Sequence, residues 1–188
     1  ERRQRILDNY PMYAYGASVL YPSKPEGYSY HNKSVWPVWQ TPLLFAAKNA
    51  GDSDVAEFLA RTIIRSGALF LSHKENMTYD TGYDGSTALN SPRQLWSVAS
   101  YLSMVYRVLF GISMSQDGMA VTPMLPEWMG GSIELTGFRY RNATVNINVK
   151  GSGTVVSSLK VNGRKKNPAT FRIPAGARGV YNLELVTA

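Results

Sequence analysis

The amino-acid sequence predicts a mixed α+β fold in two parts, helical first and strand-rich afterwards. Up to about residue 114, apolar residues recur at the three- and four-residue spacings of helices, and long aromatic, polar loops separate them. From about Asp117 onward, short segments of alternating apolar and polar residues lie between Gly, Asn and Pro. We therefore expect a helical domain over 1–114 and a small antiparallel β-sandwich over 115–188.

Composition excludes several classes of protein. The chain has 188 residues and is 44% hydrophobic, and it contains no cysteine and no apolar run long enough to span a membrane. Its net charge of +7 arises largely after Met114, where 9 basic residues face 4 acidic ones. The one tight basic cluster, Arg164-Lys165-Lys166, follows the hairpin-type turn Asn162-Gly163. A solvated turn explains this cluster, so we expect neither nucleic acid nor membrane as a partner.

Three segments of the first part carry helix signals. Pro37 suits the first turn of a helix that continues to Gly51. Ser53 can cap a second helix, in which apolar residues recur at spacings of three and four. Ser91-Pro92 opens a third helix that is apolar nearly all round and ends at Gly111. Because this helix lacks a polar face, we expect it to be buried on most sides, as in a helical array.

Strand signals dominate the second part. Val145, Ile147 and Val149 alternate with polar residues, the pattern of a half-buried antiparallel strand. Six segments have this character: 118–123, 132–139, 144–150, 155–161, 170–173 and 180–186.

Little in the sequence favours metal, phosphate or serine-triad chemistry. The only two histidines, His31 and His73, lie far apart, and there is no Gly-rich phosphate loop and no G-x-S-x-G motif. We therefore expect no metal and no cofactor. Two long loops, at about 10–32 and 73–90, instead combine carboxylates with aromatic side chains. Sugars bind to such flat apolar faces, and paired carboxyl groups cleave glycosidic bonds.

Two neighbouring segments carry a resemblance to a known family. They are 75–82, ENMTYDTG, and 91–99, SPRQLWSVA. Together they resemble the final catalytic segment of glucoamylases, trehalases and processing α-glucosidases, which are six-hairpin (α/α)6-barrel glycoside hydrolases. In those enzymes a glutamate that acts as base precedes a Gly-containing loop and then a helix opened by an aromatic residue and Ser or Thr. The resemblance implies that Glu75 is the catalytic base.

Two further stretches extend the resemblance along the chain. Segment 30–37, YHNKSVWP, is similar to a Tyr-His-Asn…Trp-Pro segment that borders the sugar pocket of debranching-type and related bacterial glycosidases. The stretch 117–149 resembles the exit from the barrel into the trailing β-domain of maltose and cellobiose phosphorylases. The four stretches follow the order of the family and span most of the chain, from residue 30 to residue 149.

The resemblance implies a fold, a reaction and a set of site residues. The fold is the C-terminal part of an (α/α)6 six-hairpin barrel followed by the β-sandwich, so we expect the remainder of the barrel upstream, including the general acid. The reaction is hydrolysis with inversion, in which Glu75 deprotonates water. Asp80 and Asp84 are further candidates for the base, although both are more typical of a turn. The expected carbohydrate-binding residues are Tyr30, His31, Asn32, Trp36, Tyr79, Asp84 and Trp96.

Two other functions stay open at this point. A disaccharide phosphorylase would replace water with phosphate and would need a basic pocket in place of a base. A non-catalytic carbohydrate-binding or accessory protein would need the aromatic loops alone. A periplasmic or secreted location is expected from the polymers that such enzymes degrade.

Overall fold

The computed structural model describes residues 5, 7–27, 29–84 and 89–188, and the chain divides into two compact units, Glu1–Met104 and Val105–Ala188. The mixed α+β class that the sequence predicts is confirmed at this level. The division falls before the expected boundary at residue 114. The reason is that Phe110, at the end of the third predicted helical segment, belongs to the hydrophobic core of the second unit, and Val105 packs against that core.

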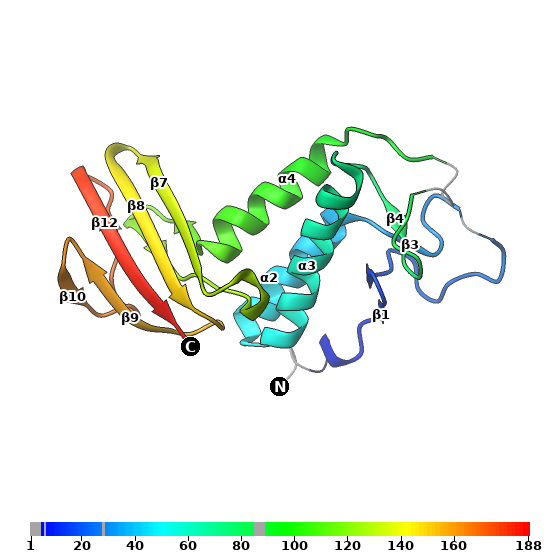
Figure 1. Cartoon of the computed structure of the whole chain (residues 1–188), viewed down its shortest axis with the longest axis horizontal. Helices are drawn as coiled ribbons and strands as arrows, with labels where there is room; N and C mark the ends of the chain where they lie inside the picture. Colours follow the sequence, from blue (N-terminus) through cyan, green and yellow to red (C-terminus); the bar gives the residue numbers. More distant parts are fainter. Residues whose placement is uncertain (1–4, 6, 28, 85–88) are drawn as a thin grey trace. The chain divides into compact units, whose positions relative to one another are not determined.

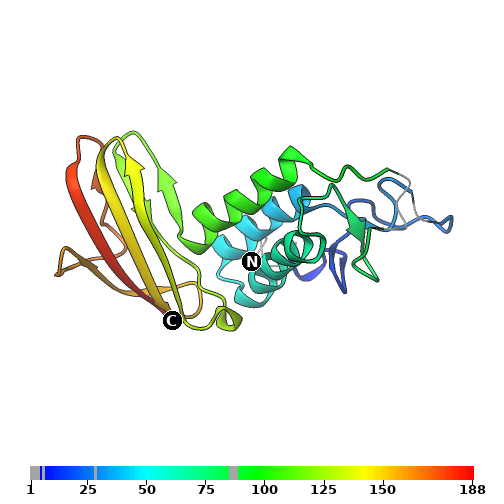
Figure 2. The same cartoon turned by 45° about the horizontal axis from the view of Figure 1, so that its top comes forward.

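Three helices form the framework of the first unit. They are α2 (Pro37–Ala50), α3 (Ser53–Phe70) and α4 (Leu95–Ser103), and the π-helix η1 (Met104–Leu109) continues α4. Figures 1 and 2 both show α2, α3 and α4 lying side by side. Their contact faces bury Leu44, Leu59 and Ile63. α2 begins at Pro37 as predicted and ends at Gly51, whose φ of 76° is the left-handed conformation that favours glycine.

Two predicted helix starts were wrong. The N-cap of α3 is Asp52, whose side chain accepts a hydrogen bond from the Val55 amide, and Ser53 is already helical. The third helix begins at Leu95, with Gln94 as its N-cap, and not at Ser91-Pro92. The polar residues before Leu95 instead form a turn whose side chains and amides bond to a neighbouring loop.

Four short strands tie the long loops of the first unit together in two antiparallel pairs. One pair joins β1 (Met12–Tyr13) to β2 (Gly16–Ala17), and the other joins β3 (Ser34–Val35) to β4 (Met77–Thr78). All four residues of β3 and β4 are buried. The second pair therefore fixes the two aromatic loops against each other.

The second unit contains two sheets around one core. A five-stranded sheet has the order β10-β9-β12-β8-β7, and a three-stranded sheet has the order β11-β6-β5. Figure 1 shows the five strands of the larger sheet side by side. The elements are β5 (Ile112–Met114), β6 (Gly118–Val121), the 3-10 helix η2 (Glu127–Met129), β7 (Ser132–Tyr140), β8 (Asn142–Gly151), β9 (Val156–Val161), β10 (Arg164–Lys166), β11 (Ile173–Pro174) and β12 (Arg178–Thr187).

Buried side chains of both sheets form one cluster that includes Met119, Val145, Ile147 and Leu183. The alternation predicted for β8 is confirmed, because Val145, Ile147 and Val149 are fully buried. The predicted turn at Asn162-Gly163 is also confirmed. Both residues have positive φ, 48° and 76°, and they join β9 to β10.

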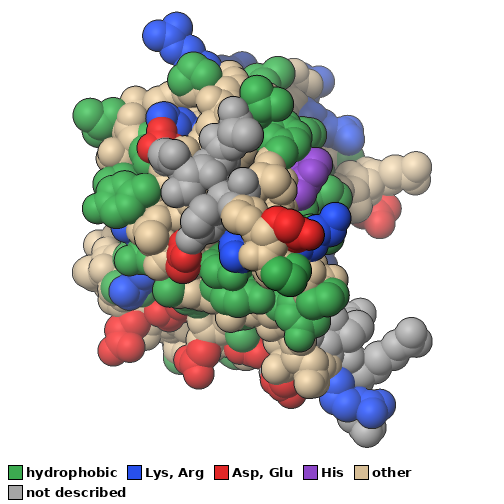
Figure 3. Space-filling view, turned by 90° about the vertical axis from the view of Figure 1, so that its right-hand side faces the viewer, with side chains coloured by type: hydrophobic (Ala, Val, Ile, Leu, Met, Phe, Trp, Pro, Cys, Tyr) green, Lys and Arg blue, Asp and Glu red, His purple; other side chains and the backbone are tan. Residues whose placement is uncertain are grey.

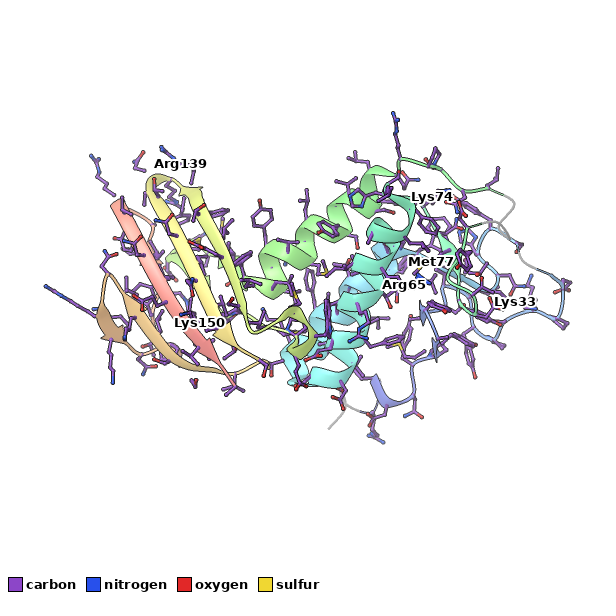
Figure 4. The ribbon with its side chains drawn as sticks, viewed as in Figure 1. Lys33, Arg65, Lys74, Met77, Arg139 and Lys150 are labelled. Atoms are coloured by element: carbon purple, nitrogen blue, oxygen red, sulfur yellow. The ribbon has the colours of Figure 1, made fainter. Side chains whose placement is uncertain are left out.

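The expectation of a purely antiparallel sandwich was wrong. β12 pairs with β8 in parallel over ten residues on each strand, from Arg178 opposite Asn142 to Thr187 opposite Gly151. Strands β9 to β11 intervene between the two in sequence and give the chain the crossover that a parallel pair needs. Figure 4 labels Arg139, near the turn between β7 and β8, and Lys150, near the opposite end of β8.

Within the described part of the chain, none of the helices combines the length and the apolar character that crossing a bilayer requires.

Two glycines offer a matched test of packing in the second unit. Gly111 (φ +64°) and Gly130 (φ +80°) are both left-handed, but a Cβ at Gly111 would lie 2.0 Å from the Thr122 carbonyl carbon, whereas nothing lies within 4 Å of one at Gly130. We expect Gly130→Ala to lower the free energy of unfolding by about 1–2 kcal/mol through backbone strain alone. We expect Gly111→Ala to lower it by about 4 kcal/mol or more, because the backbone must shift. Urea unfolding followed by circular dichroism measures both values, and equal losses would contradict the close approach at Gly111.

Candidate functional site

The predicted site residues come from two loops that the β3–β4 pair holds together. Ser34 lies opposite Thr78, and Val35 lies opposite Met77. The Tyr79 amide extends this pairing by donating to the Lys33 carbonyl, at 3.1 Å. Figure 4 shows Lys33, Lys74 and Met77 at the end of the helical unit that carries these strands. Residues distant in sequence, just before β3 and just before β4, are thereby brought into contact.

Glu75 lies at the centre of this arrangement. Its side chain is 5% exposed, and its carboxylate accepts three hydrogen bonds. The Tyr30 hydroxyl donates to Oε1 at 2.5 Å, and the Gln94 Nε2 donates to the same oxygen at 2.9 Å. The Ser91 amide donates to Oε2 at 3.2 Å. Because burial of an unpaired carboxylate is very unfavourable, these three donors are what allow Glu75 to lie here.

The segment before α4 positions Glu75 as well as bonding to its carboxylate. The Glu75 amide donates to the Ser91 carbonyl at 3.0 Å and the Gln94 amide donates to the His73 carbonyl at 2.7 Å. Asn90 adds a side-chain clamp, since its Oδ1 accepts from the Glu75 amide at 3.2 Å and its Nδ2 donates to the Asn76 carbonyl at 2.8 Å. The turn before α4 and the stretch around Glu75 therefore form one hydrogen-bonded unit.

Four aromatic rings cluster beside the carboxylate. The Trp36 ring stacks on His31 at a centroid distance of 5.1 Å, and it meets the edges of Tyr30 at 4.7 Å and of Trp96 at 5.5 Å. Trp36 is buried, whereas His31 is exposed and Trp96 is 43% exposed. On the face shown in Figure 3, hydrophobic side chains form several patches among charged and polar ones. The cluster thus combines one buried ring, that of Trp36, with the exposed ring surfaces of His31 and Trp96.

Tyr30 has a strongly perturbed acidity. The hydrogen bond to Glu75 is the largest cause, followed by partial burial and by the negative charge of Glu75, and together they raise the pKa of the Tyr30 phenol from 10.0 to about 12. The hydroxyl therefore keeps its proton, and remains a donor to Glu75, across the whole physiological range of pH.

The remaining predicted residues have other partners. Asn32 is 2% exposed, and its amide bonds to the backbone of Lys24, Glu26 and Gly27, so it organises its own loop. Tyr79 stacks on Tyr13 at 4.0 Å. Asp84 forms an ion pair with Lys74. The structure therefore brings Tyr30, His31, Trp36 and Trp96 together around Glu75, and it gives Asn32, Tyr79 and Asp84 contacts elsewhere in the loops.

Two residues that bond to Glu75, Ser91 and Gln94, and the clamp residue Asn90 were not predicted as parts of the site. The sequence placed Asn90 at the end of the second loop and assigned the residues from Ser91 onward to the helix. The Asn and Ser residues of the run from Asn90 to Gln94 were the available signal for a turn. Asn and Ser side chains, and free backbone amides before a helix, are groups that bond to neighbouring loops.

Among the described residues, no group of three His, Asp or Glu side chains is arranged to hold a metal ion. Neither a scan against models of protein families nor a search of curated proteins finds a match.

The acidity of Tyr30 predicts a pH-dependent contribution to stability. Its pKa is higher in the folded chain than in the unfolded one, so its bond to Glu75 stabilises the fold fully below about pH 10 and loses effect as the pH rises toward 12. The difference in unfolding free energy between the native chain and Tyr30→Phe should therefore be constant from pH 7 to 9 and shrink above pH 10. Guanidinium unfolding of both proteins at each pH measures it. A difference that grows above pH 10 would exclude this bond as the cause.

Removal of the Glu75 carboxylate should destabilise the first unit. Glu75→Ala leaves three partly buried donors without an acceptor, at a cost of about 2–5 kcal/mol. Glu75→Gln retains the shape and one acceptor oxygen, and we expect it to cost less than half as much. Thermal unfolding monitored by tryptophan fluorescence reports on this unit through Trp36 and Trp96, and an unchanged midpoint in Glu75→Ala would contradict the role of the carboxylate in ordering the loops.

Proposed function

We propose that this chain carries the general base of an inverting glycoside hydrolase, and that Glu75 is that base. The observation that supports it most directly is a nearly buried carboxylate, 5% exposed, fixed by three donors beside exposed aromatic rings. A general base must be held in one position and must face its substrate without competing bulk water. Glu75 meets the first requirement through its donors and the second through its burial.

The hydrogen bonds of Glu75 are unevenly divided between its oxygens. An ionised carboxylate offers about four lone-pair positions. Among the described residues, Oε1 accepts from both Tyr30 and Gln94, whereas Oε2 accepts only from the Ser91 amide. Oε2 therefore keeps a lone pair for a water molecule. In the proposed reaction this oxygen removes a proton from the water as the water oxygen bonds to the anomeric carbon.

The aromatic cluster supplies a surface for a sugar ring. His31 is exposed and Trp96 is 43% exposed, and both rings contact the buried ring of Trp36. The Trp36 indole is fixed in turn by its Nε1, which donates to the Ser34 hydroxyl at 3.0 Å. Flat and rigid aromatic faces bind the apolar faces of sugars with little loss of side-chain entropy.

An inverting hydrolase needs a second carboxyl group, about 6.5–9.5 Å from the base, to protonate the leaving oxygen. In this proposal α2, α3 and α4 belong to an (α/α)6 barrel, and the general acid comes from an upstream part of that barrel. Asp84 is a poor candidate for the acid because its carboxylate forms an ion pair with Lys74.

A substrate that needs no general acid tests the base by itself. Glycosyl fluorides lose fluoride without protonation, so the chain alone should hydrolyse a fluoride of the correct sugar and anomer. Water adds to the anomeric carbon, the carbon–fluorine bond breaks, fluoride leaves with the bonding electrons, and Glu75 takes the water proton. Glu75→Gln should lower the rate about 100-fold or more, because a positioned base contributes about 10²–10⁴-fold. A fluoride electrode measures release from a panel of α- and β-glycosyl fluorides.

Controls separate this function from its alternatives. Asp80→Asn changes an exposed carboxylate in the same loop and should leave the rate within about twofold. NMR of the product should show the anomer opposite to that of the fluoride. Formation of a sugar 1-phosphate in phosphate buffer would instead identify a phosphorylase. Sugar binding without release of any fluoride would identify a non-catalytic binding protein, and either result would overturn the proposal.

A further inference from the structure

A pocket of about 410 Å³ lies in the first loop, and the described residues that line it fall within 19–27 and 29–32. Val19 and Leu20 provide an apolar wall, Tyr30 and His31 provide rings, and Ser29 provides a hydroxyl. This mixture of flat apolar surface and a few polar groups is typical of small-molecule sites, and the volume lies within their usual range of about 300–1,000 Å³.

Among the described residues that line this pocket, Lys24 is the only one with a permanent charge. No carboxylate contributes to the described wall. A ligand that carries a negative charge would therefore find one cation here and no like charge in the wall, which favours anionic over neutral ligands of the same shape.

The backbone that carries Lys24 is held in place by a buried side chain. Asn32, which is 2% exposed, accepts from the Lys24 amide at 2.9 Å and donates to the Lys24 carbonyl at 3.3 Å. The same amide nitrogen also bonds to the carbonyls of Glu26 and Gly27, both at 3.1 Å. The position from which the Lys24 side chain extends is therefore fixed before any ligand arrives, which lowers the entropy cost of binding.

Tyr30 connects this pocket to the candidate catalytic carboxylate. Its side chain lines the pocket, and its hydroxyl donates to Glu75 at 2.5 Å. A ligand in the pocket would thus contact the residue whose hydroxyl bonds to the Glu75 carboxylate. His31, which also lines the pocket, stacks on Trp36 of the aromatic cluster.

We propose that this pocket is a subsite for an acidic sugar unit of the substrate, whose carboxylate or sulfate group pairs with Lys24. The proposal rests on the function proposed for Glu75 and narrows its substrate class to saccharides that contain uronate or sulfated units. Lys24 recognises the charge, and Asn32 acts as a positioning residue through the backbone of Lys24.

The test is a binding titration of the full chain by two-dimensional amide NMR. Glucuronate, glucose 6-sulfate and glucose are added separately, and the amide shifts of Val19, Leu20, Ser29 and His31 are followed. We expect the acidic sugars to shift these resonances and to bind at least about threefold more tightly than glucose, with the preference lost at high salt because the charge is exposed. The tighter of the two acidic sugars identifies whether the subsite takes a carboxylate or a sulfate.

Variants assign the effect to Lys24. Lys24→Met should weaken binding of the preferred acidic sugar about three- to fivefold and leave glucose unchanged, whereas Lys24→Arg should retain the preference. Lys160→Met removes an exposed cation from β9 and should have no effect. Equal binding of acidic and neutral sugars, or an acidic preference that survives in Lys24→Met, would overturn the subsite. If all three sugars shift only the amides of Ser91 and Gln94, the subsite fails while the sugar site at Glu75 stands. Absence of any shift from all three sugars counts against both proposals.

Discussion

The organisation of the first unit depends on one constraint. The Glu75 carboxylate is nearly buried, so the protein must supply the hydrogen bonds that water would otherwise give it. Glu75 is 5% exposed, and the protein replaces its hydration with donors from Tyr30, Ser91 and Gln94. These donors come from the first loop, from the turn before α4 and from the N-cap of α4 itself. An unpaired carboxylate here would be far more costly than ordering these segments, so their positions are linked through the charge that they surround.

Contacts with helices α2 and α3 fix other parts of the two long loops. Gln40 of α2, fully buried, bonds to both backbone groups of Ala17 and so fixes the first loop. Arg65 of α3, labelled in Figure 4, lies over the Tyr15 ring at 4.5 Å. Tyr15 in turn packs against Gly82 so closely that a Cβ there would lie 2.7 Å from the ring. The glycine of the second loop is required by this contact and by its positive φ of 70°.

The parts of the fold that sequence could predict are those that local chemistry decides. The turn at Asn162-Gly163 and the end of α2 at Gly51 both require positive φ, which Asn and Gly adopt at least cost. The sequence predicted Ser53 as the N-cap of α3 in place of Asp52, and Ser91-Pro92 as the start of α4 in place of Leu95. Neighbouring residues have similar capping propensities, and tertiary hydrogen bonds select among them. The parallel pairing joins β8 to β12, two strands that are distant in sequence. An alternating pattern indicates which face of a strand is buried, but not which strand lies next to it.

The residues of the candidate site also differ in how far the sequence alone predicts them. The sequence suggested Glu75 and the aromatic residues as candidates, whereas the composition of the run before α4 indicates a turn but not its partner, because the bonds of Ser91 and Gln94 to Glu75 exist only in the folded chain. A buried charge with good partners contributes little net stability, since desolvation offsets most of what its hydrogen bonds return, and apolar residues of similar volume stabilise a core at least as well. Stability alone therefore gives no reason to bury an acid at this position. We therefore propose that the fixed carboxylate of Glu75, next to exposed rings, has a chemical role in addition to its structural one.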